Sequence, residues 1–363
     1  MAGILGIFQP SRLDFGDGSE AVAGNKLKLA RLLMAVGAHG LIGRDAQASL
    51  LILNYHRLHP SQGRGASAFD DGVFDTDIDT FARQMRWLKA ATTVLDEDGL
   101  LKAASAGSLD GKSIYSAVTF DDGYIDCYEL ARPILDELGI HALFFIPVEM
   151  IESRRLGWWD IAAYLLKRTE LESITLDGRT YDLGKNFAPA LKQILHDFKL
   201  ERSDRTEGLL FRLSDTCRVP IPGPNEQSAE LMTWSQIRQL RNSGHAIGSH
   251  AMSHRVLATL DASTQEHEII GSRTELQAAV GASVVSFAYP VGGPQHFNQV
   301  SVALVREAGY EQAFTFNTGI SSVPIADRFQ IPRESAKSLS ALKAKALLPR
   351  VMGIVGTHSA YPA

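Results

Sequence analysis

The chain has 363 residues, of which 45% are hydrophobic and 21% charged, a balance typical of a soluble globular protein. Its 36 Lys and Arg residues are outnumbered by 41 Asp and Glu residues, and no basic run is interleaved with aromatics. Nucleic acid is therefore excluded as the main partner. Two cysteines, Cys127 and Cys217, are too few for a disulfide framework.

Residues 1–48 are predicted to form an N-terminal arm with one amphipathic helix between Lys26 and Ile42. This helix either packs on the main domain or makes weak contact with a membrane surface. No apolar stretch reaches the roughly 20 residues of a transmembrane helix. Residues 1–20 lack the basic start and apolar core of a signal peptide, which favours a cytoplasmic location.

After the arm, apolar runs of strand length alternate with helical patterns, and this alternation predicts a parallel, barrel-like sheet. A helix is predicted to begin at Asp77 or Asp79, one of which would cap it. The predicted strands are residues 50–56, 92–95, 117–120, 142–146, 246–249, 284–288, 312–316 and 329–331. The other predicted helices are a segment ending near 106 and residues 124–138, 234–242, 264–280 and 297–308.

The alternation is interrupted at about residues 153–229, which are predicted to be a mostly helical insertion carried on a main domain of residues 49–340. Trp158 and Trp159, near its start, are either core residues or a stacking platform for sugar rings. Residues 341–363 are predicted to be a C-terminal helix and tail.

The strand at 117–120 ends abruptly in Asp121, Asp122 and Gly123. Catalytic groups gather at the carboxyl ends of strands in α/β folds. Because side chains alternate along a strand, the two carboxylates should point in different directions, so that one could hold a metal while the other moves protons. The alternative is a strand-to-helix turn in which one Asp caps the helix that begins near Tyr124.

His250 and His254 follow the strand at 246–249 and would lie on one face of a helical turn. Neutral imidazoles are common metal ligands. Together with Asp122 they would leave a coordination position open for water, which a hydrolytic site requires and a structural zinc site does not. A third strand end, 286–293, runs through Pro290 to two glycines and is either a rigid turn or a loop whose backbone N–H groups approach a substrate.

The stretches 119–123, 249–254 and 287–292 resemble, in order and spacing, the motifs of the polysaccharide deacetylase family, the NodB-homology carbohydrate esterases. The similarity covers about residues 50–335. The chain is most similar to exopolysaccharide deacetylases that act on poly-N-acetylglucosamine, which share its Tyr55-His56 pair and the Phe-Ala-Tyr-Pro form of the third motif. The resemblance implies an α/β fold, a distorted (β/α) barrel of the NodB type.

The resemblance also implies roles for individual residues. Asp122, His250 and His254 would bind a divalent metal, most simply Zn²⁺, although Ni²⁺, Co²⁺ or Fe²⁺ also suits these ligands. Asp121 would be the catalytic base. The implied activity is a hydrolase that removes N-acetyl groups from a glycan or a glycan precursor and releases acetate.

The chain departs from the commoner family pattern at two points. Ala288 stands where an Arg usually holds the base, and we predict that Arg333 takes this role, the alternative being a surface salt bridge. The usual late His motif is absent, so His56 is predicted to be the acid, as in the exopolysaccharide relatives, with His358 as the fallback.

Four further residues are predicted to contact the substrate. Tyr124 and Tyr289 are candidate pocket residues, and Pro290 precedes Val291, whose backbone N–H would by resemblance stabilise the oxyanion.

A catalytically degenerate carbohydrate-binding protein on the same scaffold is the alternative function, although the intact ligand set argues against it. A phosphatase-type nucleophile needs Asp-x-Asp, which the adjacent acids do not provide. The relatives act outside the cytoplasm, whereas no export signal is recognisable in this sequence. Both a cytoplasmic and an extracytoplasmic location therefore stay open.

Overall fold

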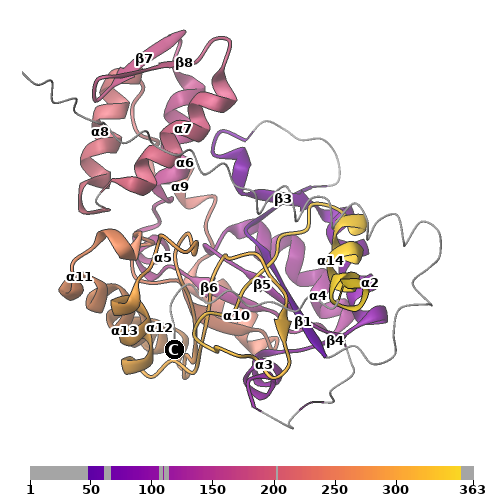
Figure 1. Cartoon of the computed structure of the whole chain (residues 1–363). Helices are drawn as coiled ribbons and strands as arrows, with labels where there is room; N and C mark the ends of the chain where they lie inside the picture. Colours follow the sequence, from indigo (N-terminus) through magenta and orange to yellow (C-terminus); the bar gives the residue numbers. More distant parts are fainter. Residues whose placement is uncertain (1–47, 61–66, 106–108, 110–113, 202, 353–363) are drawn as a thin grey trace, which may run out of the picture.

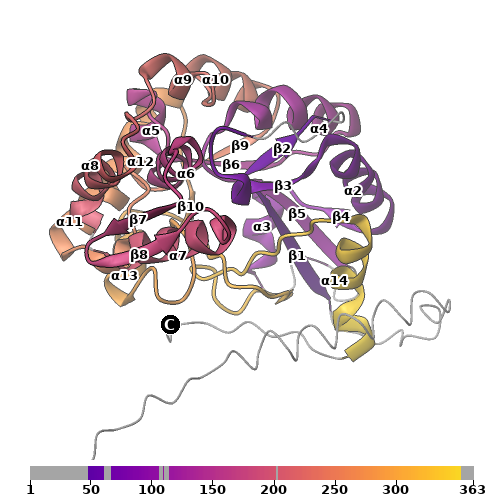
Figure 2. The ribbon, with the colours of Figure 1, turned by 90° about the horizontal axis from the view of Figure 1, so that it is seen from above.

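The computed structural model describes residues 48–60, 67–105, 109, 114–201 and 203–352. The predicted N-terminal arm with its amphipathic helix, and His358, lie outside these ranges. Figures 1 and 2 show a barrel-like body on which a second, mostly helical lobe stands. Within the described ranges, none of the helices has the length and apolarity needed to cross a bilayer.

The body is built on an eight-stranded sheet in the order β11-β10-β9-β6-β5-β1-β12, with β4 also paired to β5. Neighbouring strands are parallel, except that β12 runs antiparallel to β1. The predicted distorted barrel is therefore confirmed. The strands are β1 (Ser49–Tyr55), β4 (Thr93–Val94), β5 (Ile114–Phe120), β6 (Leu143–Ile146), β9 (Ala246–Ser249), β10 (Ser286–Ala288), β11 (Gln312–Phe314) and β12 (Ser321–Ser322).

The gap between the first and last parallel strands is bridged by residues 331–334. Ile331 exchanges backbone hydrogen bonds with β11, donating to Ala313 O at 2.9 Å and accepting from Thr315 N at 2.8 Å. Glu334 does the same with β1, through Ile52 O and Asn54 N. The prediction of a strand at 329–331 is wrong, because this segment forms only an isolated β-bridge, between Ile331 and Phe314. The Ile331 and Glu334 bridges nevertheless close the barrel and place Arg333 inside it.

Helices cover the outside of this sheet (Figures 1 and 2). Two of the predicted helical segments each contain a π-helical turn, Cys127–Ala131 in one and His267–Gly271 in the other. The helices of the body are α2 (Ile78–Ala91), α3 (Glu97–Ala103), α4 (Arg132–Leu138), α5 (Val148–Ser153), α10 (Trp234–Asn242), α11 (Ala262–Glu266), α12 (Ser272–Val280), α13 (Gln299–Glu307) and α14 (Leu339–Met352).

Local signals set several of these boundaries as predicted. Asp77 is the residue that caps α2, its carboxylate accepting from Thr80 N at 2.7 Å. Gly139 ends α4 with a φ of 62°, a conformation that favours glycine.

Alternating side chains divide the core into two layers. In β1, Leu50 and Ile52 point into the barrel, whereas Leu51, Leu53 and Tyr55 pack under the outer helices. At the carboxyl end the inward positions become polar, and β1 and β5 there contribute the side chains described in the next section.

The insertion contains α6 (Trp158–Arg168), α7 (Phe187–Leu200), α8 (Thr206–Cys217) and α9 (Pro224–Ser228). It also contains a hairpin that the sequence analysis missed, formed by β7 (Ser173–Leu176) and β8 (Arg179–Asp182). The signal was the Asp177-Gly178 pair, whose φ angles of 46° and 83° suit a tight hairpin turn.

Candidate metal centre and active site

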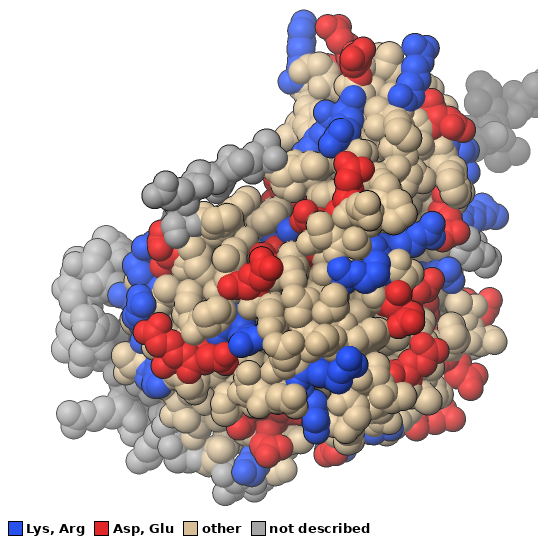
Figure 3. Space-filling model, turned by 180° about the vertical axis from the view of Figure 1, so that it is seen from behind, with Lys and Arg blue, Asp and Glu red and all other residues tan. Residues whose placement is uncertain are grey.

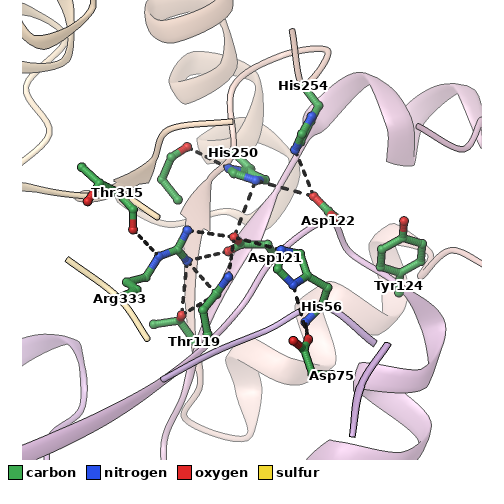
Figure 4. Close-up of polar contacts among 12 residues, drawn as sticks. His56, Asp75, Thr119, Asp121, Asp122, Tyr124, His250, His254, Thr315 and Arg333 are labelled. Carbon is green, nitrogen blue, oxygen red and sulfur yellow. Dashed lines mark hydrogen bonds and ion pairs between the residues drawn. The ribbon is translucent and has the colours of Figure 1, made fainter. Parts of the chain in front are cut away.

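Strand register brings the three motifs together at the carboxyl end of the barrel. Tyr55 pairs with Phe120, so the residues that follow them, His56 and Asp121, lie side by side. The backbone N–H of Asp121 donates to Tyr55 O at 2.9 Å. On the other side, Ser249 of β9 pairs with both β6 and β10, which places His250 beside Ala288. All these side chains therefore gather at one edge of the sheet (Figure 4).

Asp121 is clamped by Arg333. Guanidinium Nη1 donates to Oδ1 at 2.7 Å and Nη2 donates to Oδ2 at 2.8 Å, while Asn54 Nδ2 donates to Oδ2 at 3.0 Å (Figure 4). Arg333 is only 1% exposed, so the alternative of a surface salt bridge is excluded. Burial alone would raise the pKa of Asp121, but the charge and hydrogen bonds of Arg333 hold it well below its usual range.

Asp122 turns away from this clamp toward the two histidines, as the alternation along the strand predicts. Its Oδ1 lies 3.5 Å from Nε2 of His250 and 3.3 Å from Nε2 of His254 (Figure 4). One ligand atom from each residue lies within 4.8 Å of the others, and all three residues are buried. Among the described residues, this is the group of His, Cys, Asp and Glu side chains that could hold a metal ion.

Two local features fit a metal at this position. Asp122 Oδ1 is buried without a hydrogen-bond partner among the described residues, a costly state that a cation would relieve. Nδ1 of His250 donates to Ala288 O at 2.8 Å, which leaves the lone pair of Nε2 directed at Asp122. Burial lowers the pKa of His250 to about 4 despite the nearby carboxylates, so its ring is neutral at pH 7, as metal ligation requires.

The backbone around this group is strained. Seven described non-glycine residues have positive φ, and four of them lie in the three motifs: Asp122 at 71°, Ala251 at 63°, His254 at 57° and Val291 at 60°. Each such conformation costs on the order of 1–3 kcal/mol and persists only where the surrounding structure holds it. For a β-branched residue such as Val291 it is especially unfavourable. The fold therefore stores strain at the edge where the motifs meet.

His56 faces Asp121 from the other side, with Nε2 4.0 Å from Asp121 Oδ2. Its Nδ1 lies 3.3 Å from Oδ2 of Asp75, a residue of β3 (Phe74–Asp77) that pairs with β2 (Arg57–His59). Burial disfavours the protonated ring, but the hydrogen bond and charge of Asp75, with the charges of Asp122 and Asp121, raise the pKa of His56 to about 9.

The insertion contacts the candidate metal-ligand group, Asp122, His250 and His254, directly through Trp159. The Trp159 ring lies 4.4 Å from that of His254, centroid to centroid, and Trp159 Nε1 donates to the Tyr124 hydroxyl at 2.7 Å. That hydroxyl in turn donates to Asp160 Oδ2 at 2.6 Å. Trp159 is thus a core residue, one of the two roles expected for the pair.

The four predicted substrate contacts have different surroundings. Tyr124 and Tyr289 are fully buried, and the Tyr289 hydroxyl donates to Phe329 O at 3.1 Å, so neither ring offers surface to a substrate in this conformation. Pro290 is buried as well, whereas Val291 is partly exposed at the turn of the third motif. Their roles stay predictions.

Phe316 is an exposed aromatic residue at this edge that the sequence analysis did not single out. Its ring is 36% exposed and stands edge-on to that of His56, with centroids 5.8 Å apart. Its backbone N–H donates to Gly292 O at 2.8 Å, and a Cβ on Gly292 would lie 2.6 Å from that nitrogen, so only glycine fits there. The third motif thus holds an aromatic face beside His56.

A second missed residue, Glu268, anchors the loop that joins the two histidines. It is 1% exposed, and its carboxylate accepts from Met252 N at 3.1 Å, from Ser253 N at 2.9 Å and from the Ser253 hydroxyl. It lies in a π-helical turn, 14 residues after His254, and no local pattern links the two.

Glu268→Ala is expected to weaken metal binding about 10–100-fold, as outer-shell substitutions do. It should also lower the free energy of unfolding by about 1–3 kcal/mol, because the buried Met252 amide and the partly buried Ser253 amide lose their acceptor. Calorimetric titration with Zn²⁺ and urea unfolding measure the two effects. Glu266→Ala, at an exposed position two residues earlier, is the control, and equal metal affinity in both variants would contradict the anchoring role.

Comparisons with known proteins identify the fold and the family of the chain. Among solved structures, the chain is similar to the Streptococcus pyogenes deacetylase PplD in complex with acetate, with 18% identity and a TM-score of 0.54 over 82% of this chain and 98% of that one. It is also similar to IcaB from Ammonifex degensii, with 17% identity and a TM-score of 0.52 over 82% and 97%. These likenesses establish the fold. A search of the curated proteins found no match.

The family comparison reaches further than the structural one. A family model described as polysaccharide deacetylase matches residues 108–313, more than half of the chain, and this span contains all three motifs. The chain therefore belongs to the polysaccharide deacetylase family and is a carbohydrate deacetylase, a hydrolase.

Proposed function

We propose that the protein is a divalent-metal-dependent N-deacetylase that releases acetate from an N-acetylated glycan. The observation that carries this proposal is that the adjacent carboxylates of Asp121 and Asp122 have different partners. Asp122 faces the imidazoles of His250 and His254, whereas Asp121 is clamped by Arg333 within 4.0 Å of His56 and 3.8 Å of His250. A base, an acid and a ligand group thus converge on one point, as metal-assisted amide hydrolysis requires.

A divalent cation bound by Asp122, His250 and His254 would supply a Lewis acid for the acetyl carbonyl and a more acidic water. Asp121, ionised and fixed by Arg333, accepts the proton of the attacking water. The backbone N–H of Val291 is the proposed donor to the oxyanion. Protonated His56 gives its Nε2 proton to the sugar nitrogen as the C–N bond breaks, which leaves a free amine and acetate.

The test is acetate release from N-acetylglucosamine oligomers by Zn²⁺-loaded protein, beside the Asp121→Asn and His56→Ala variants. We expect release by the wild type, a loss of at least about 100-fold in each variant, and metal retained in both. Stoichiometric metal without release from any N-acetylated glycan would overturn the proposal in favour of a carbohydrate-binding scaffold.

The pH dependence of the same reaction tests the acid. A His pKa raised to about 9 keeps the ring protonated at neutral pH, so kcat/KM should fall as pH rises through that value. Asp75→Asn removes the negative charge and keeps one amide oxygen as an acceptor, which lowers the pKa of His56 and should move the descending limb down by about one pH unit. A cation at Asp122 offsets that carboxylate equally in both proteins, so superimposable profiles would rule out Asp75 as the partner of the acid.

A further inference from the structure

The geometry points to a second sugar-binding site in the cavity between the insertion and the barrel. Resting on the proposed function, we propose that this cavity holds a neutral sugar unit of the same glycan chain, remote from the unit that loses its acetyl group. The substrate is then an oligomer or polymer rather than a single sugar.

The cavity has a volume of about 320 Å³ and is lined by α5, the segment that leads into α6, and α8. This size lies within the range of small-molecule sites in proteins. Two aromatic side chains line it: Trp158, which is partly exposed, and Phe211, which is 61% exposed. An exposed aromatic face is a costly surface feature but suits the apolar C–H faces of a sugar ring.

The charged side chains of the lining are balanced. Arg155, Arg255, Glu149 and Glu207 all line the cavity, and within the described part of the chain none of these four side chains has an ion pair or a side-chain hydrogen bond. Two guanidiniums supply donors and two carboxylates supply acceptors, which together match the hydroxyls of a sugar. A ligand with a net charge of either sign would instead meet two like charges.

The back of the molecule has a mixed distribution of charge. Figure 3 shows basic and acidic side chains interspersed over the back of the molecule rather than gathered by sign. That face offers no single-sign field that would attract a charged polymer.

The cavity is connected to the metal-ligand group through the start of α6. The ring centroids of Trp158 and Trp159 lie 5.5 Å apart, and those of Trp159 and His254 lie 4.4 Å apart. The Trp158 ring is therefore about 10 Å or less from the imidazole of His254. Arg255 directly follows His254 in the chain. A glycan chain that presents one unit to His254 can therefore reach the cavity with a unit further along the chain.

The experiment compares chain lengths. Rates of acetate release are measured for the dimer and the hexamer of N-acetylglucosamine, in β-1,4 and β-1,6 linkage, by Zn²⁺-loaded protein. We expect the wild type to prefer the hexamer and Phe211→Ala to reduce the hexamer-to-dimer ratio of kcat/KM about 5–10-fold, mainly through KM. Leu200→Ala, which removes an equally exposed apolar side chain from α7 outside the cavity lining, is the matched control and should keep the wild-type ratio.

Direct binding separates this inference from the proposed function. Calorimetric titration of the hexamer into Asp121→Asn should give an affinity that falls 5–10-fold when Phe211→Ala is added. A wild-type hexamer-to-dimer ratio in Phe211→Ala, with acetate still released, overturns the cavity site alone. Failure of the wild type and of every variant to release acetate overturns the proposed function. If the affinity for the hexamer is also unchanged by Phe211→Ala, the cavity site is overturned as well.

Discussion

Arg333→Met is expected to lower kcat about 100–1000-fold, the range seen when a preorganised charged contact at a reacting group is removed. The substitution leaves the Asp121 carboxylate buried without its bidentate partner, so the free energy of unfolding should fall by about 3–5 kcal/mol. The pKa of Asp121 should rise, because burial then acts with less opposition. The Asp121 carboxylate would become protonated, and so cease to act as a base, as pH falls through this raised pKa. The ascending limb of the pH–rate profile should therefore move to higher pH.

Arg333→Lys is the informative companion variant, since it keeps the charge and loses the fork that reaches both carboxylate oxygens. It should recover most of the stability but only part of the rate. Urea unfolding and pH–rate profiles of the three proteins measure these effects. An Arg333→Met protein with an unchanged ascending limb would show that Asp121 is not held by this residue during turnover.

Asp122→Asn is expected to lower metal affinity by more than about 100-fold, beyond the usual effect of an outer-shell change, and to abolish acetate release. The carboxylate is the only anionic side chain of the candidate ligand group, in which it lies with His250 and His254. The metal-free variant should unfold at nearly the wild-type temperature, because the lost oxygen has no hydrogen-bond partner among the described residues.

Elemental analysis and melting curves with and without Zn²⁺ check this expectation. Wild-type protein should gain stability with Zn²⁺, and Asp122→Asn should not. Asp215→Asn, an exposed carboxylate on α8, is the control and should respond as the wild type does. Full metal occupancy in Asp122→Asn would show that the metal binds at a site that does not include the Asp122 carboxylate.

The strand ends could be predicted because their signals are local. An apolar run that stops at Asp121 and Asp122, or at His250, already contains the alternation that sends neighbouring side chains to different partners. Arg333 could be proposed because a late strand end was expected near it, although that strand proved to be only a pair of bridges.

The remaining parts of the site depend on contacts between distant segments. Asp75 meets His56 through the short β2–β3 pairing, and Glu268 reaches the histidine loop from a helix whose own periodicity marks it only as a buried position. The partners of the Tyr124 hydroxyl are also distant in sequence. Its place after the acid pair predicts a pocket residue, and that role stays a prediction, whereas its contacts with Trp159 and Asp160 of the insertion could not be predicted.

The bridging of the barrel by residues 331–334 has a consequence for biosynthesis. Asp121 and Arg333 are 212 positions apart, and the guanidinium arrives on a segment that binds β11 on one side and β1 on the other. While the chain is being made, β1 to β11 emerge first and expose an uncompensated carboxylate at an unclosed edge. The Asp121–Arg333 clamp is thus completed only after residues 331–334 have left the ribosome, and a product truncated before Ile331 would lack both the bridge that closes the barrel and the partner of Asp121.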